Sequence, residues 1–194
     1  MERVKVKLDF LNCVGVDCEG RSGGLALLWN EDVVPVRVLS LSKRHIDAVI
    51  DDKWRCTGFY GHPITARHFE SWNMLRRLKS ESSLPWIVGG DFNELLQLDE
   101  KEGESLRSSR QIEDFRDAAE YCELRDLGFY GPRFTWCNGQ YQGTLISERL
   151  DRVLATEGWM ALYPNARVIN LVSPLSDHCS ILLELEVRGQ EDLV

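Results

Sequence analysis

Short strand-like stretches follow one another from residue 24 to residue 60 with no helix between them, and this run constrains the fold of the 194-residue chain most strongly. A doubly wound parallel sheet needs a helix between nearly every pair of strands, so that architecture ranks second. Two packed sheets with outer helices fit better, in one domain over 1–187 with a polar tail at 188–194. We expect strands at 24–29, 33–41, 46–50, 54–60, 84–88, 134–136, 146–154, 166–172 and 181–187.

Three segments have the periodicity of amphipathic helices. Over 66–79, an apolar side chain recurs at every third residue: Phe69, Trp72, Leu75 and Leu78. Over 111–123, one face carries Ile112, Phe115, Ala118, Ala119 and Cys122. A short third helix over 156–162 is expected to be capped by Thr156.

Composition and charge limit the class of protein. The chain has no run near the ~18 apolar residues of a membrane span and no secretory signal at its start. Its six cysteines form no Cys-x-x-Cys pair and are expected to be buried free thiols, which fits a nuclear or cytoplasmic protein. The net charge of −8 counts against a nucleic-acid-binding module, but less against a metal-dependent phosphodiesterase, whose site is itself acidic.

Three acidic positions each lie beside an expected core strand: Asp91 after Trp86-Ile87-Val88-Gly89-Gly90, Asp151 before Arg152-Val153-Leu154, and Asp177-His178 before 181–185. An acid in such a place is costly unless it is paired, hydrogen-bonded or bound to metal. Each also has an ordinary explanation.

Asp91 could cap a turn, Asp151 could pair with Arg149 or Arg152, and Asp177 could cap a turn beside a partly buried His178. The three positions are informative as an ordered set.

The ordered segments Gly89-Gly90-Asp91-Phe92-Asn93, 149–154 (RLDRVL) and Ser176-Asp177-His178, with Tyr60-Gly61-His62-Pro63 upstream, resemble the motifs of the endonuclease/exonuclease/phosphatase superfamily. Further segments at 23–29 (GGLALLW), 124–129 (LRDLGF) and 134–136 (FTW) resemble the endonuclease domains of plant-type non-LTR (LINE-type) retrotransposons. The resemblance implies a four-layered α/β/β/α sandwich, a metal-dependent phosphodiesterase activity and DNA as the substrate.

The resemblance also implies roles for individual residues. Asp91 would accept a proton from the attacking water, and Asn93 would bind the scissile phosphate or the metal. His178 would contact a phosphoryl oxygen and be oriented by Asp151, while Tyr60 would help to hold the phosphate. Hard oxygen ligands suit Mg²⁺ or Mn²⁺, and no thiolate cluster indicates zinc. The implied metal ligands are Asp91, Asn93, Asp177 and His178.

The chain departs from the family pattern at its start. Family members begin with a strand carrying an Asn and continue through a helix to a strand ending in a Glu that binds metal. This chain is expected to start after both, so two strands and a helix would be missing and catalysis weakened or lost. At the start, Val4, Val6, Leu8 and Phe10 alternate as in a strand, whereas the resemblance places a helix end there. Ser180 stands where the family usually has proline.

Two alternatives to a nuclease stay open. One is a non-catalytic remnant that binds nucleic acid or protein, for which the first helix offers candidate basic residues, unless these form an ordinary solvated face: Arg67, His68, Arg76, Arg77 and Lys79. The other is a phosphomonoesterase or phospholipase of the same superfamily, which the retroelement-like segments disfavour. No membrane partner or small-molecule cofactor is expected.

Overall fold

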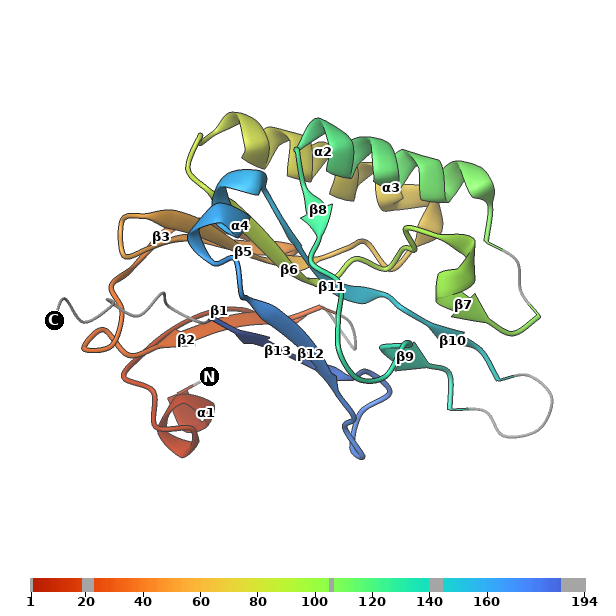
Figure 1. The fold of residues 1–194 in the computed structure, drawn as a ribbon. Coiled ribbons are helices and arrows are strands. Elements are labelled where there is room, and N and C mark those ends of the chain that lie inside the picture. The colour runs from red at the N-terminus through yellow and green to blue at the C-terminus, as the bar shows by residue number, and fades with distance from the viewer. Residues whose placement is uncertain (1, 19–22, 105–106, 140–144, 186–194) are drawn as a thin grey trace, which may run out of the picture.

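The computed structural model describes residues 2–18, 23–104, 107–139 and 145–185, and its elements form four layers (Figure 1). Two long helices cover one face of a six-stranded sheet, and two strand pairs lie on its other face, with the N-terminal helix outside them. The α/β/β/α sandwich is therefore confirmed. The expected tail, 188–194, lies outside the described residues.

The helices are α1 (Glu2–Lys7), α2 (His68–Ser80), α3 (Ser109–Tyr121) and α4 (Glu157–Leu162), with 3-10 turns η1 (Thr65–Arg67) and η2 (Leu98–Glu100). The strands are β1 (Asn12–Val16), β2 (Leu25–Trp29), β3 (Val36–Ser42), β4 (His45–Ile50), β5 (Trp54–Tyr60), β6 (Trp86–Asp91), β7 (Lys101–Glu102), β8 (Arg125–Asp126), β9 (Trp136–Cys137), β10 (Ser147–Glu148), β11 (Asp151–Ala155), β12 (Arg167–Leu171) and β13 (Ser180–Glu184). None of the helices in the described ranges is both long and apolar enough to cross a bilayer.

The six-stranded sheet has the order β3-β4-β5-β6-β11-β8. β5 and β6 are parallel, and α2 makes the crossover between them, whereas the other neighbours are antiparallel. β5 and β6 are therefore the two central strands. Because both faces of the sheet are covered, consecutive apolar residues are buried in β6 (Trp86, Ile87 and Val88) and in its neighbour β11 (Val153, Leu154 and Ala155).

The second β layer consists of two antiparallel pairs, β1-β2 and β12-β13, and no ladder joins them in the described residues. A cavity of about 340 Å³ lies between this layer and the large sheet. Its lining is mostly apolar, includes Ile87, Val153, Ile181 and Leu183, and reaches Asp151. The short strands β7, β10 and β9 form a separate sheet beside the ends of β6 and β11.

The core between the helices and the large sheet is aromatic. Trp72 of α2 stacks on Phe115 of α3, with ring centroids 4.5 Å apart, and Phe115 also contacts Phe92. Each of these side chains is buried, which contributes roughly 1.5–3 kcal/mol per residue of this size. This packing fixes the position of β6, which carries Asp91 at its end.

Several local expectations need correction. Residues 2–7 form a helix, so the alternation of Val4 and Val6 did not indicate a strand. Phe69 is exposed, because a strict three-residue spacing drifts around a helix of 3.6 residues per turn. The expected strand at 146–154 is broken into β10 and β11. Strand β1 was not expected at all.

Thr156 precedes α4 but does not cap it with its side chain. Its Oγ1 instead accepts a hydrogen bond from the Trp86 backbone N–H at 2.9 Å, tying the end of β11 to the start of β6. All six cysteines are free, but only Cys122 is buried.

Candidate active site

Three of the expected site residues lie in one row across the large sheet. Tyr60 at the end of β5 pairs with Asp91 at the end of β6, and Asp91 pairs with Asp151 at the start of β11. Neighbouring strands are about 4.8 Å apart, so the three side chains are brought together by the sheet itself. Residues from three separate motifs thus meet where β5 and β6 end and β11 begins, which we call the active-site edge of the sheet.

Two glycines allow this edge to be so compact. Gly90 has φ 142°, and a Cβ there would lie 2.1 Å from the carbonyl oxygen of Phe59 on the neighbouring strand. A Cβ at Gly61 would lie 2.1 Å from the carbonyl oxygen of Phe92. Only glycine fits where the two backbones approach this closely.

Asn93 is held against Asp91. The Asp91 Oδ1 accepts the Asn93 backbone N–H at 2.8 Å, and Asp91 Oδ2 accepts the Asn93 side-chain amide at 2.9 Å. The same Nδ2 donates to the Gly61 carbonyl oxygen at 3.0 Å. Both amide hydrogens are therefore engaged within the protein, so Asn93 presents only its carbonyl oxygen to a ligand, an atom suited to a cation and not to a phosphate oxygen.

His178 is anchored by Asp151. The imidazole Nδ1 lies 2.8 Å from Asp151 Oδ2, while the Asp151 backbone N–H donates to Thr135 Oγ1 at 2.9 Å. The hydrogen bond to Asp151, followed by the charges of Asp151 and Asp91, raises the pKa of His178, although burial opposes this. With Nδ1 occupied, Nε2 is the nitrogen available to donate to a phosphoryl oxygen.

The surroundings of Asp91 disfavour the ionised form of its carboxyl group. Burial and then the charge of Asp151 raise its pKa to about 6, and the hydrogen bonds from Asn93 and the charge of His178 only partly offset this. A carboxyl with a pKa close to the working pH is a good general base or acid. A bound cation would relieve the same repulsion.

Asp177 stands apart from this group. It is exposed, and its Oδ2 accepts a hydrogen bond from Trp136 Nε1 at 3.1 Å. Trp136 also lies beside His178, with ring centroids 6.5 Å apart and a β-bridge between the two residues. Trp136 is thus a site residue that the sequence reasoning missed; its only signal was its place in the segment 134–136.

The residues that are present do not complete a metal site. Within the described ranges, no group of three or more His, Cys, Asp or Glu side chains is arranged to hold a metal ion. Asp91 and the Asn93 oxygen are adjacent hard donors, but Asp177 and His178 do not join Asp91 in such a group. A bound Mg²⁺ or Mn²⁺ would need further oxygen ligands.

The neighbouring arginines do not neutralise Asp151. Arg149 and Arg152 instead bind Glu100 and Asp126 in a buried network with distances of 2.8–3.0 Å. Because successive side chains of a strand alternate between its faces, Arg152 points away from Asp151 and lies over the Phe115 ring. The suggested ion pair of Asp151 with either arginine is therefore wrong.

The basic residues expected on the helix 66–79, which lie on η1 and α2, do not form a patch of unpaired positive charge. Arg67 pairs with Glu70, Arg77 with Glu81 and Lys79 with Glu123, while Arg76 lies over the Tyr121 ring. His68 is buried against Glu94. Of these five residues only Arg76 has no acidic partner in the described part of the chain, so α2 offers a single unpaired positive charge and not a basic patch.

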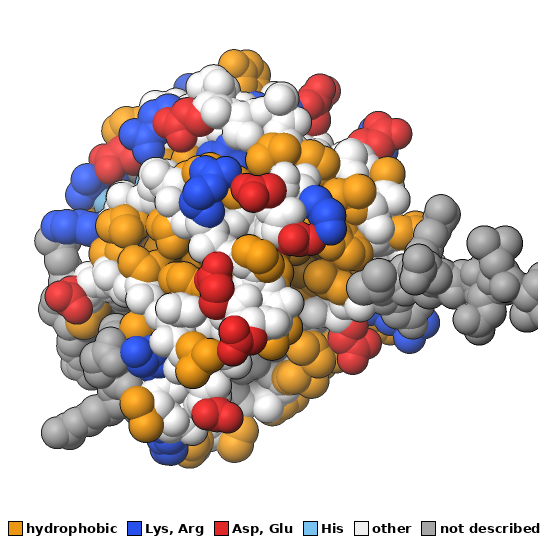
Figure 2. All heavy atoms as spheres, turned by 90° about the vertical axis from the view of Figure 1, so that its left-hand side faces the viewer, with side chains coloured by type: hydrophobic (Ala, Val, Ile, Leu, Met, Phe, Trp, Pro, Cys, Tyr) orange, Lys and Arg blue, Asp and Glu red, His pale blue; other side chains and the backbone are white. Residues whose placement is uncertain are grey.

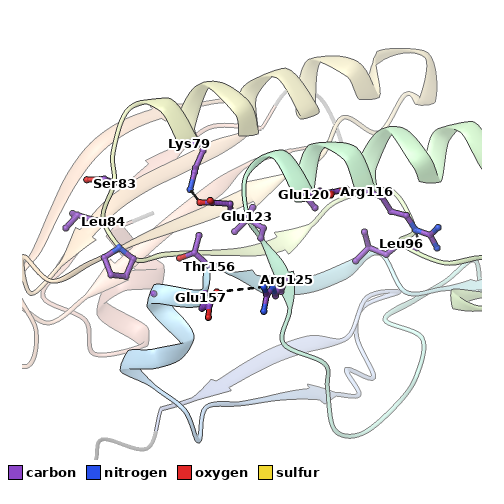
Figure 3. Close-up of a pocket in the computed structure, with 14 residues that line it drawn as sticks. Lys79, Ser83, Leu84, Leu96, Arg116, Glu120, Glu123, Arg125, Thr156 and Glu157 are labelled. Atoms are coloured by element: carbon purple, nitrogen blue, oxygen red, sulfur yellow. Dashed lines mark hydrogen bonds and ion pairs between the residues drawn. The ribbon is translucent and has the colours of Figure 1, made fainter.

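Another cavity lies at the opposite end of β6 and β11 (Figure 3). Its volume is about 780 Å³, and its wall carries the ion pairs Lys79–Glu123 and Arg125–Glu157. Figure 2 shows the face at this end, where acidic, basic and apolar side chains are interspersed. With balanced charge and none of the expected site residues, this cavity is not a candidate for the chemistry.

Comparisons with known proteins place this geometry in context. The model of the Endonuclease/Exonuclease/phosphatase family matches residues 8–178. The endonuclease domain of TRAS1, a telomere-specific non-LTR retrotransposon, is similar with a TM-score of 0.69 and 17% identity, over 91% of this chain and 80% of that one. The 3'-5' exonuclease NExo from Neisseria meningitidis gives 0.69 and 17%, over 94% and 82%. An AP endonuclease from Archaeoglobus fulgidus gives 0.66 and 16%, over 96% and 83%. A comparison with curated proteins gave no match.

Proposed function

The chain belongs to the endonuclease/exonuclease/phosphatase family, and from this premise we propose that it is a DNA endonuclease-like phosphodiesterase domain derived from a retroelement. The retroelement origin rests on the segments at 23–29, 124–129 and 134–136. Hydrolysis by the described residues alone is expected to be weak or absent, because they do not complete a metal site.

One observation carries the proposal: Asp91, Asp151 and His178 come from three distant motifs and meet at the active-site edge of the sheet. A stable fold does not need two carboxylates on neighbouring strands, one of them bonded to a histidine. A phosphodiester, by contrast, needs a proton acceptor for water and a donor to the phosphoryl oxygens.

The residues divide these tasks between them. Asp91, with a pKa of about 6, accepts the proton of the attacking water. His178, oriented by Asp151 through Nδ1, donates from Nε2 to a non-bridging phosphate oxygen. Tyr60 lies on the other side of Asp91 and holds the phosphate from there. The new P–O bond to water forms as the P–O bond to the leaving oxygen breaks.

A divalent cation, Mg²⁺ or Mn²⁺, would stabilise charge on the phosphate and the leaving oxygen. Asp91 and the carbonyl oxygen of Asn93 are the residues best placed to contribute to its binding. An incomplete ligand set is expected to lower the rate by roughly 10²–10⁴-fold, as does the removal of one key catalytic group.

The test is an assay of supercoiled, nicked and abasic DNA with Mg²⁺ or Mn²⁺, with binding measured separately in EDTA. We expect DNA binding and slow cleavage, which His178→Ala abolishes. The control Asp52→Asn, whose carboxylate is exposed and pairs with Arg37, should behave as wild type. A protein that neither binds nor cuts DNA would contradict the proposal, and preferential hydrolysis of inositol phosphates would assign it to the phosphomonoesterases.

The incomplete ligand set also favours a second candidate, a non-catalytic DNA-binding remnant. Binding in EDTA without any metal-dependent cleavage, even at high enzyme concentration, would distinguish this candidate from a slow nuclease.

A further inference from the structure

We propose that Arg44 binds a backbone phosphate of the nucleic acid next to the scissile one, on the Tyr60 side of the site. This inference rests on the proposed function and adds to it a phosphate contact that the motifs do not contain. Arg44 lies outside every segment that carries the family resemblance.

The β3–β4 hairpin positions Arg44. Lys43 and Arg44 form its two-residue turn, and the Arg44 carbonyl oxygen accepts the Tyr60 backbone N–H at 2.9 Å. The guanidinium carbon lies 5.2 Å from the centre of the Tyr60 ring. Its Nη1 donates to the Gly61 carbonyl oxygen at 3.4 Å, the same oxygen that accepts the Asn93 amide. Arg44 is therefore held against the candidate active site by both backbone and side chain.

The motif residues offer a phosphate few donors, the Tyr60 hydroxyl and one ring nitrogen of His178, and this makes Arg44 significant. Asp91 and Asp151 only accept when ionised, and both amide hydrogens of Asn93 are already used. His178 has one free ring nitrogen. A polyanion approaching the active-site edge needs more N–H groups than the motif residues supply, and Arg44 carries five, of which it uses one.

Arg44 also makes no salt bridge within the described parts of the chain, although it is half-buried. The hydrogen bond from Arg67 and, to a smaller extent, the charge of Arg44 lower the pKa of Glu70, but the carboxylate of Glu70 is bound by Arg67. By contrast, Arg55 holds Asp47, Arg107 holds Glu148, and Arg152 holds Glu100. In a protein of net charge −8, an arginine without a salt bridge, stacked on a site tyrosine, is a ready partner for an external anion.

The position selects the phosphate. Tyr60, Asp91 and Asp151 occupy successive strands, so Arg44 beside Tyr60 and His178 beside Asp151 lie on opposite sides of Asp91. Arg44 immediately precedes β4, so it lies three strand positions from Asp151, roughly 14 Å, whereas Tyr60 on β5 lies two positions away. Arg44 is thus one strand further from His178 than Tyr60 is. It therefore meets the phosphate next to the one that His178 and Tyr60 contact.

The experiment measures binding of a fluorescent, nicked 20-base-pair duplex by anisotropy in EDTA, over a range of salt concentrations. Arg44→Ala is expected to weaken binding about tenfold at low salt, as for the loss of one charge-assisted contact. The slope of log K against log salt should fall by about 0.9, the value for one phosphate. Arg44→Lys should keep the slope.

Arg37→Ala is the matched control, because it removes the same charge from the same hairpin. Its side chain is 63% exposed and pairs with Asp52, away from the turn. Equal effects of Arg44→Ala and Arg37→Ala, at unchanged melting temperatures, would overturn the role of Arg44 and leave the proposed function standing. If the wild type shows no salt-dependent binding at all, the proposed function itself fails.

Discussion

Replacing Asp91 with Asn should stabilise the fold at neutral pH and not at acidic pH. The carboxyl has a pKa of about 6 in the folded protein, against an ordinary value of roughly 3.9. The folded state therefore binds this proton more tightly than the unfolded state does. Stability falls as the pH rises from about 4 to about 6, and a difference of about two in pKa corresponds to roughly 3 kcal/mol.

An asparagine at position 91 removes this cost but loses one hydrogen bond. The present carboxylate accepts both the Asn93 N–H and the Asn93 side-chain amide, and an amide can replace only one of these acceptors. That loss is worth about 1–1.5 kcal/mol. The net effect is a gain of roughly 1.5–2 kcal/mol at pH 7.5 and a loss of about 1 kcal/mol at pH 4, where the wild-type carboxyl is itself protonated.

The assay is urea unfolding in EDTA at several pH values between 4 and 8. A gain of this size corresponds to about 3–8 °C in melting temperature for a domain of this length. Asp52→Asn, at an exposed carboxylate, is the control and should show no such pH dependence. A constant difference between Asp91→Asn and wild type across the pH range would show that Asp91 is an ordinary ionised carboxylate, and the electrostatic argument would be refuted.

Three further predictions concern the same region. Asp151→Asn removes the partner that raises the pKa of His178, so NMR titration of the imidazole should give a lower pKa; an unchanged value would exclude that contact. Gly61→Ala brings a Cβ against the carbonyl oxygen of Phe92 and should cost about 2–4 kcal/mol, measured from the urea midpoint; a neutral effect would mean that the two segments separate readily. Glu100→Ala leaves two buried arginines with one fewer carboxylate and should cost about 3–5 kcal/mol, measured in the same way, whereas a loss below 1 kcal/mol would show that water enters the network.

The sequence predicted the architecture because its dominant signals are local. The strand pattern over 24–60 and the apolar face of 111–123 depend only on periodicity. The four strands β2 to β5 and the helix α3 are present where these patterns predicted them. The strand predicted over 146–154 is two strands in the structure. β10 pairs in the three-stranded sheet and β11 in the six-stranded sheet, and this difference in partners cannot be seen from periodicity. The same holds for Thr156, whose hydroxyl bonds to Trp86, 70 residues away in sequence.

The sequence predicted the site residues that belong to a motif. It did not predict residues that reach the site only through tertiary contacts. Asp91, Asn93, Asp151, Asp177 and His178 were expected to meet. Asp91, Asn93, Asp151 and His178 lie together, whereas Asp177 is exposed and bonded to Trp136. Arg44 has no motif of its own and becomes relevant only because the β3–β4 turn lies against Tyr60.

The distribution of charge partners argues that the acids at the active-site edge are kept for something other than stability. Two arginines flank Asp151 in sequence, yet both point into a network with Glu100 and Asp126, where every charge is paired. At the edge, Asp91 and Asp151 share a single histidine, and Asp91 has a pKa that makes it destabilising at neutral pH. A sequence selected only for stability would replace Asp91 with a neutral residue, since nothing in the packing requires its charge. Asp91 has the pKa of a general base, and it lies near the oriented imidazole of His178 and near Arg44, which makes no salt bridge with any described residue. This combination is explained if a phosphodiester binds at this end of the strands.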